Sequence, residues 1–234
     1  MHVFVLTGAG ISAESGLGTF RDTDGVWAKF DPMKLATPEA FARDPQHVHE
    51  FYNHRRCGLL AAVPNPAHQA LARLERQLVA EAGGVFLCTQ NIDDLHERAG
   101  SRHVHHMHGE LLKSLCTRCG ARAPCTHDLS ILDTCASCGS LNCLRPDVVW
   151  FGEMPYGMEE IEAALEASEL FVSIGTSGEV YPAAGYVELA RSLGIETCEV
   201  NLAPSENAHA FDRALYGPAT EAVPAFVTEL LEAR

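Results

Sequence analysis

Two cysteine pairs constrain this chain of 234 residues more than any other feature of its sequence. Cys116 and Cys119 form one CxxC pair, Cys135 and Cys138 form a second, and a loop of 15 residues joins them. Each pair can place two thiolates on one tetrahedral Zn²⁺, and the loop lets the pairs face each other. Four thiolates close such a site, so we expect one structural zinc that folds residues 111–146 and takes no part in chemistry.

The remaining five cysteines fall into two groups. Cys125 and Cys143 lie in the same segment as the pairs, and either could replace a ligand, with Cys143 the better substitute. Cys57, Cys88 and Cys198 lie in apolar or helical contexts, so we expect them to be core residues.

The N-terminus and the cysteine content together indicate a cytoplasmic protein. Residues 1–6 are apolar but no basic region precedes them, so they do not form a signal peptide. No stretch approaches the ~18 apolar residues of a membrane-spanning helix. In a reducing compartment, nine cysteines favour metal binding over disulfides.

The charge balance excludes some partners. Seventeen basic and 31 acidic residues give a formal net charge of −14. This argues against a general affinity for nucleic acid or for an anionic membrane. It is compatible with a basic partner such as a lysine-rich peptide.

Short apolar runs alternate with helical patterns along the chain, which predicts an α/β fold with a mainly parallel sheet. The expected strands are residues 2–7, 85–89, 170–175 and 196–202, and the expected helices are residues 65–82, 91–99, 159–167, 183–193 and 223–231.

A glycine turn follows the first expected strand. Residues 8–13 read G-A-G-I-S-A and fit the pattern G-x-G-x-x-[GA], in which missing Cβ atoms let a pyrophosphate approach the backbone. A tight strand-to-helix turn without a ligand would look the same. A dehydrogenase would also carry an acidic residue at the end of a second strand about twenty residues later. Here residues 19–22 read T-F-R-D and the next strand begins at Val85, so a simple hydride-transfer enzyme is not favoured.

Residues 103–110 read H-V-H-H-M-H-G-E, and these histidines could be metal ligands, a catalytic base or surface residues. The surrounding motifs resemble those of the sirtuins, NAD-dependent protein-lysine deacylases, and in particular the bacterial type of class III that removes succinyl and malonyl groups. The matching motifs, in the order of that family, are G-A-G-I-S at 8–12, T-F-R-D at 19–22, T-Q-N-I-D at 89–93, H-G-E at 108–110, the paired CxxC, V-W-F-G-E at 149–153, G-T-S at 175–177 and N-L at 201–202.

The resemblance implies two domains with a cleft between them. The large Rossmann-like domain would comprise residues 1–25, 65–110 and 147–234. The smaller, inserted domain would comprise a helical part at 26–64 and a zinc ribbon at 111–146. NAD and an acylated lysine would meet in the cleft.

The resemblance also implies the NAD site. The glycine turn would cradle the pyrophosphate, the motif at 89–93 would shape the nicotinamide and ribose pocket, and Phe20 would cover the reacting ribose. The implied NAD-binding residues are Gly8, Ala9, Gly10, Ser12, Phe20, Arg21, Gln90, Asn91, Asp93, Gly175, Thr176, Ser177, Asn201 and Ala219.

His108 matches the general base of the family. It would take a proton from a ribose hydroxyl, a role that suits a neutral imidazole near pH 7. The implied products are nicotinamide, free lysine and O-acyl-ADP-ribose. His103, His105 and His106 match no functional position, and we expect them to be strand or loop residues unless one replaces a zinc ligand.

Substrate recognition is implied at two places. Val149, Phe151 and Gly152 would pair with the substrate backbone as a strand, and Val180 would flank the peptide from the other side. The acyl group would meet the residues of a Y-x-x-R pattern.

In this pattern Tyr52 and Arg55 are spaced i, i+3, so they share one face of a helix. A guanidinium fork and a phenol hydroxyl match a carboxylate, as in the sirtuins that remove succinyl and malonyl. Arg56 is expected to point elsewhere. In the alternative, Arg55 pairs with a surface acid and Tyr52 only packs in the core.

The favoured function is therefore NAD-dependent removal of succinyl, malonyl and acetyl groups from protein lysines by a monomer. Two alternatives remain open from the sequence. A mono-ADP-ribosyltransferase would deliver the same ribose carbon to a protein nucleophile. A non-catalytic, zinc-bearing NAD sensor would have no need of a base such as His108.

Overall fold

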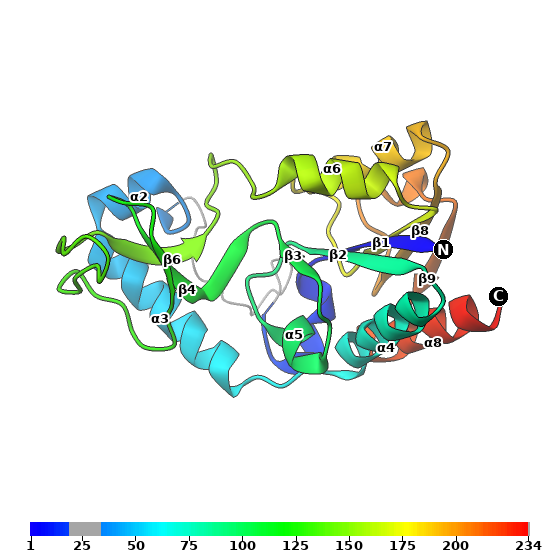
Figure 1. Cartoon of the computed structure of the whole chain (residues 1–234), viewed down its shortest axis with the longest axis horizontal. Helices are drawn as coiled ribbons and strands as arrows, with labels where there is room; N and C mark the ends of the chain where they lie inside the picture. The colour runs from blue at the N-terminus through cyan, green and yellow to red at the C-terminus, as the bar shows by residue number, and fades with distance from the viewer. Residues whose placement is uncertain (19–33, 234) are drawn as a thin grey trace.

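The computed structural model describes residues 1–18 and 34–233. The expected NAD residues Phe20 and Arg21 lie outside this part. Six of the described strands form a parallel sheet in the order β3-β2-β1-β7-β8-β9 (Figure 1). They are β1 (His2–Thr7), β2 (Gly84–Thr89), β3 (Val104–His106), β7 (Leu170–Ile174), β8 (Glu196–Asn201) and β9 (Arg213–Tyr216).

The order of these strands reverses beside β1. From β1 the chain proceeds outward to β2 and β3, and then returns to add β7, β8 and β9 on the other side. In an open parallel sheet, ligands bind at such a switch point, in the crevice beyond the carboxyl ends of the strands. The turns after β1 and β7 are therefore the place where the topology favours a site.

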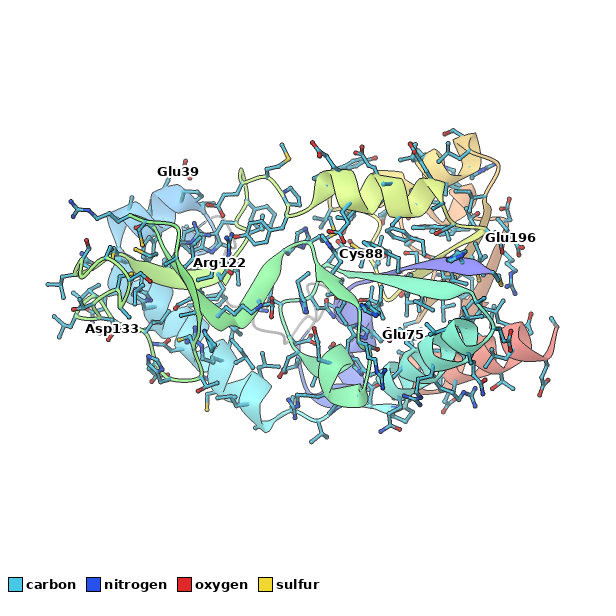
Figure 2. All side chains as sticks on the ribbon, in the orientation of Figure 1. Glu39, Glu75, Cys88, Arg122, Asp133 and Glu196 are labelled. Atoms are coloured by element: carbon cyan, nitrogen blue, oxygen red, sulfur yellow. The ribbon has the colours of Figure 1, made fainter. Side chains whose placement is uncertain are left out.

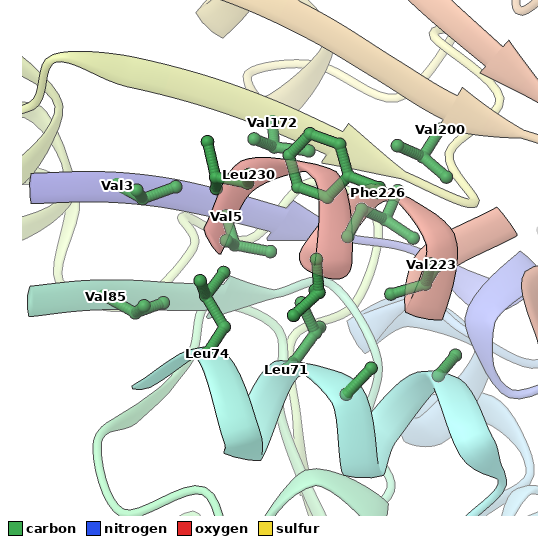
Figure 3. Packing of buried hydrophobic residues seen from close by; sticks show 14 of the residues in the cluster. Val3, Val5, Leu71, Leu74, Val85, Val172, Val200, Val223, Phe226 and Leu230 are labelled. Atoms are coloured by element: carbon green, nitrogen blue, oxygen red, sulfur yellow. The ribbon is translucent and has the colours of Figure 1, made fainter. Parts of the chain in front are cut away.

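Helices cover both faces of the large sheet (Figure 1). One face packs against α4 (Pro66–Ala80) and α8 (Ala219–Glu232), and the other packs against α6 (Met158–Glu166) and α7 (Tyr186–Ser192). Side chains alternate across a strand, so β1 contributes to both cores. Val3 and Val5 meet Leu71, Leu74 and Phe226 on the first face (Figure 3).

A second, antiparallel sheet of the described residues has the order β5-β4-β6. Its strands are β4 (Gly109–Cys116), β5 (Arg122–Pro124) and β6 (Leu144–Val148), and α2 (Pro38–Arg43) and α3 (Pro45–Ala61) lie beside it. Asp133, in the loops that carry the cysteines, lies at the opposite end of the molecule from Glu196 of the large sheet (Figure 2). At this tip, the buried cluster consists of Cys116, Cys135 and Cys143.

Three expectations need correction. The helix expected at residues 91–99 is limited to α5 (Leu95–Ala99), because the amide of Asn91 donates to Thr89 Oγ1 and holds the preceding segment in a turn. The strands β3 and β9 were not expected, since they have only three and four residues and lie at the two edges of the sheet. Cys57 was expected in the core but is exposed on α3, whereas Cys88 and Cys198 are buried.

Among the described residues, no helix has the length and the hydropathy that a membrane crossing requires.

The core between β1, α4 and α8 should carry much of the stability. Phe226 is fully buried, so Phe226→Ala leaves a cavity and should lower the free energy of unfolding by about 3–5 kcal/mol. The exposed Glu232 on the same helix offers a control, and Glu232→Ala should change that free energy by less than about 0.5 kcal/mol. Urea unfolding followed by circular dichroism measures both. Similar losses in the two variants would contradict this assignment of the core.

Candidate active site

One cleft is lined by every described residue that the sequence assigned to catalysis, NAD or substrate. It extends from the turns after β1, β2, β7 and β8 to the segment that follows β6. The residues that line it are Gly8, Ala9, Gly10, Ser12, Gln90, Asn91, Asp93, His108, Gly175, Thr176, Ser177, Asn201 and Ala219, together with Tyr52, Arg55, Val149, Phe151, Gly152 and Val180.

The glycine turn after β1 lies directly against the turn after β7. The amides of Gly8 and Gly10 donate to the carbonyls of Ile174 and Gly175, both at 2.9 Å. A Cβ atom on Gly8 would lie 2.7 Å from Gly175 O, and one on Gly10 would lie 2.7 Å from Gly175 Cα. Only glycine permits this close approach of the two turns, whose residues line the cleft. A glycine turn at the end of a strand can receive a pyrophosphate.

A cluster of buried polar side chains connects the turns that line the cleft. The Asn91 side-chain amide donates to Gly8 O at 3.1 Å and to Ser12 Oγ at 3.2 Å, and Ser12 Oγ donates to Asp93 Oδ2 at 3.0 Å. Burial raises the pKa of Asp93. The cluster joins the turn after β1 to the turn after β2, so the two turns form one rigid wall.

The turns after β7 and β8, on the other side of the cleft, are also held by hydrogen bonds. Asn201 Nδ2 donates to Thr176 O at 2.8 Å, and the Glu179 amide donates to Ser177 Oγ at 3.2 Å. Ala219 is the first residue of α8.

His108 lies between the two sheets, immediately before β4. Its Nδ1 is 3.0 Å from the backbone carbonyl of Gln90. A carbonyl oxygen can only accept, so Nδ1 carries the proton and Nε2 of the neutral ring holds the lone pair. Burial lowers the pKa of His108, and its hydrogen bond to Gln90 opposes this in part. The imidazole is therefore a neutral base near pH 7.

The neighbouring histidines have other contacts. His105 Nε2 lies 3.0 Å from Tyr156 O, and His106 Nε2 lies 2.6 Å from Glu97 Oε1. His103 is exposed.

Tyr52 and Arg55 lie together on one face of α3, as their spacing predicted. The Arg55 Cζ atom is 5.9 Å from the centre of the Tyr52 ring. Tyr52 is 3% exposed, and burial raises its pKa, so the phenol keeps its proton at neutral pH. Arg56 points away, as expected, and donates to Leu111 O at 3.2 Å and to Asn53 Oδ1 at 2.7 Å.

The segment expected to pair with the peptide follows β6 but is not itself a strand. The amide of Val149 donates to His108 O at 2.8 Å, and that of Phe151 donates to Ala36 O at 2.9 Å. Pairing with a peptide would therefore have to use other backbone groups of this segment. Phe151, Met154 and Tyr181 expose large apolar side chains beside it.

The sequence did not single out Trp150 as a site residue, although it lines the cleft and donates from its indole nitrogen to Tyr52 Oη at 2.9 Å. The sequence feature that could have indicated its role was its position between Val149 and Phe151, which were both expected to contact the substrate.

The four cysteines of the two pairs converge at the tip of the small sheet. Their sulfur atoms all lie within 4.8 Å of one another. Two of the separations, Cys116 to Cys138 at 3.8 Å and Cys119 to Cys135 at 3.7 Å, match the edge of about 3.8 Å of a tetrahedron with metal–sulfur bonds of about 2.3 Å. The cluster fits one structural zinc. Cys143 Sγ lies 3.5 Å from Cys116 Sγ but also 3.0 Å from the carbonyl of Ser140.

Single substitutions should show whether zinc is bound by the four cysteines of the two pairs or by Cys143 in place of one of them. We expect Cys119→Ser to lose most of the bound zinc and to lower the melting temperature, because a closed structural site contributes directly to folding. Cys143→Ser should keep about one zinc per chain. Elemental analysis of the purified variants and thermal unfolding measure these effects. Zinc loss in Cys143→Ser with retention in Cys119→Ser would show that Cys143 is the ligand.

The chain is similar to known proteins along nearly its whole length. The model of the Sir2 family matches residues 8–182. An NAD-dependent protein deacylase of Caulobacter vibrioides is 61% identical over 231 residues, which cover 99% of this chain and 97% of that protein. The NAD-dependent protein deacylase SIR2rp3 of Leishmania major is 51% identical over 233 residues, with coverages of 98% and 96%.

Solved structures agree with these relatives. A complex of a Sir2 homolog with NAD has a TM-score of 0.89 and 40% identity, over 99% of this chain and 90% of that one. A Sir2 variant with a deacetylated p53 peptide and 3′-O-acetyl ADP-ribose has a TM-score of 0.82 and 30% identity, with coverages of 99% and 92%. By sequence, fold and the arrangement of its cleft, this chain belongs to the Sir2 family.

Proposed function

We propose that this chain is an NAD-dependent protein deacylase that removes succinyl, malonyl and acetyl groups from lysine. One observation carries the proposal: a neutral histidine base lies in the same cleft as the glycine turn and the Tyr52–Arg55 pair. The names of the relatives support the deacylase activity. The choice of acyl group rests on Tyr52 and Arg55.

We assign the NAD site to the turns that line the cleft, and their geometry supports this assignment. The backbone at residues 8–10 receives the pyrophosphate, and the cluster of Ser12, Asn91 and Asp93 with Gln90 forms the nicotinamide and ribose pocket. The turn at 175–177 with Asn201 and Ala219 holds the adenosine half. Phe20 and Arg21 complete the site in this proposal. When bound, NAD supplies a ribose carbon that the acyl oxygen can attack as nicotinamide departs.

His108 moves the proton in the following step. Its Nε2 takes a proton from a ribose hydroxyl, which makes that oxygen able to attack the acyl carbon. The Gln90 carbonyl keeps the required tautomer by accepting the Nδ1 proton, and stabilises the imidazolium that forms. Water completes the release of free lysine and O-acyl-ADP-ribose.

Tyr52 and Arg55 select the acyl group. The guanidinium and the phenol both donate hydrogen bonds to the terminal carboxylate of succinyl or malonyl. Val149, Phe151 and Gly152 contact the peptide from one side and Val180 contacts it from the other, with the apolar side chains nearby covering the lysine stem.

We also infer the organisation of the enzyme from its two sheets. The large domain comprises residues 1–25, 65–110 and 147–234, and the small domain comprises 26–64 and 111–146. The enzyme acts as a monomer in the cytoplasm, where the thiols of Cys116, Cys119, Cys135 and Cys138 stay reduced and hold zinc.

Removal of the base should greatly slow turnover. We expect His108→Ala to lower kcat/KM by about 10²- to 10⁴-fold on succinyl- and acetyl-lysine peptides alike, with NAD still bound in calorimetry. His103→Ala, an exposed histidine in the same stretch, is the control and should keep wild-type activity. Mass spectrometry should detect O-acyl-ADP-ribose. A protein that gains ADP-ribose instead would indicate a transferase, and NAD binding with no acyl loss in the wild type would indicate a sensor.

The pH profile should report the same base. A general base must be deprotonated, and burial lowers the pKa of His108. The acid limb of kcat/KM should therefore fall below pH 6.5, the ordinary value for histidine, and the rate should be level from there toward pH 8. An acid limb above pH 7 would contradict the assignment.

Substitutions of the adjacent Arg55 and Arg56 should have different effects. The first should change the preference between acyl groups, and the second should change stability. Arg55→Met should raise KM for a succinyl-lysine peptide by about ten- to a hundredfold and affect an acetyl-lysine peptide far less, because only the first has a carboxylate. Arg56→Met removes hydrogen bonds to Leu111 and Asn53, so it should lower the melting temperature without changing the ratio of the two activities. Equal losses on both peptides in Arg55→Met would reduce Arg55 to a structural residue.

A further inference from the structure

The hydrogen bond between Trp150 and Tyr52 determines where the phenol proton can go. The indole Nε1 lies 2.9 Å from Tyr52 Oη, and both side chains are buried. An indole N–H can only donate, so the Tyr52 oxygen is the acceptor. The proton of Tyr52 must therefore point away from Trp150. Within residues 1–18 and 34–233, no group accepts it.

Trp150 is itself held from two sides. The Arg145 Cζ atom lies 3.4 Å from the centre of the Trp150 ring, which is a close cation–π contact. Arg145 is fixed in turn by Glu153, whose carboxylate oxygens accept from its two terminal nitrogens at 2.6 and 2.8 Å. Glu153 also accepts from the backbone amide of Trp150 at 2.8 Å. Ring and backbone of Trp150 are thus both fixed, so the indole N–H has one direction.

The contacts around Tyr52 leave its hydroxyl as a hydrogen-bond donor toward the pocket. Arg145 and Glu153 form an ion pair, so the charge of Arg145 is neutralised by Glu153 and not by the ring of Trp150. Tyr52 remains a neutral phenol with an occupied oxygen lone pair, in the wall of the cleft beside Arg55. A group in this state is a donor to whatever enters the pocket. A carboxylate, which only accepts, is the complementary ligand.

We propose that Trp150 is a positioning residue for acyl selectivity, which occupies the Tyr52 oxygen and thereby directs the phenol proton toward the acyl carboxylate. The inference rests on the proposed function, in which Tyr52 and Arg55 meet that carboxylate. It adds a link from the peptide-binding segment to the acyl pocket, because Trp150 lies between Val149 and Phe151.

The test removes the indole N–H and keeps the ring. Trp150→Phe should raise KM for a succinyl-lysine peptide about five- to tenfold at saturating NAD, with kcat changed less than about twofold. KM for the matched acetyl-lysine peptide should change less than about twofold, because that acyl group does not use the phenol proton. A fall of kcat and kcat/KM on both peptides alike would overturn the inference and leave Trp150 a core residue.

A double-mutant cycle tests whether Trp150 acts through Tyr52. Tyr52→Phe should lower the ratio of succinyl to acetyl activity, and adding Trp150→Phe to it should lower that ratio little further. If the double variant lowers the ratio of succinyl to acetyl activity by the product of the two single effects, the residues act independently and the inference is overturned. If Trp150→Phe does not fold, the same comparison applies to a protein in which Trp150 alone is replaced by benzothienylalanine, where sulfur takes the place of the N–H group.

Assays of the wild-type enzyme distinguish a failure of this inference from a failure of the proposed function. Deacylation without any preference for succinyl over acetyl would overturn the role of Trp150 while the deacylase assignment stands. A wild type that removes no acyl group with NAD present would instead overturn the proposed function and, with it, this inference.

Discussion

The arrangement of the cleft depends on one close contact, between the turn after β1 and the turn after β7. The two backbones approach so closely that a Cβ on Gly8 or Gly10 would lie 2.7 Å from an atom of Gly175. This contact sets the position of the backbone that faces the cleft at the switch point of the sheet. The Asn91 amide then joins a third turn to the first through Gly8 O. Three turns from separate parts of the chain therefore form one wall.

His108 shows how the two sheets combine in the site. Its ring is held by the carboxyl end of β2 through Gln90 O, and its backbone carbonyl is held by Val149 after β6. Burial then has opposite effects on the pKa values of the two key groups. It lowers the pKa of His108 and raises the pKa of Tyr52, because it disfavours the charged form of each. Both side chains therefore favour their neutral forms.

Much of the fold and of the site follows from local patterns. The central strands are continuous apolar runs, α4 begins at an Asn-Pro cap, and the cysteine pairs have the spacing of a metal site. The errors concern features with no local signal. β9 is four residues long, the turn at residues 91–94 is held by contacts with Thr89, and Cys57 lies on the exposed side of a helix whose apolar and polar residues are poorly separated.

The sequence by itself determined the class of fold, the two cysteine pairs and the glycine turn, because each depends on residue type and short spacing. The tertiary structure decided which groups meet: the tautomer of His108, the cluster of Ser12, Asn91 and Asp93, and the bond from Trp150 to Tyr52. The last joins residues 98 positions apart. Such contacts arise only when packing brings distant segments together, and no periodicity in the chain encodes the direction of a single hydrogen bond.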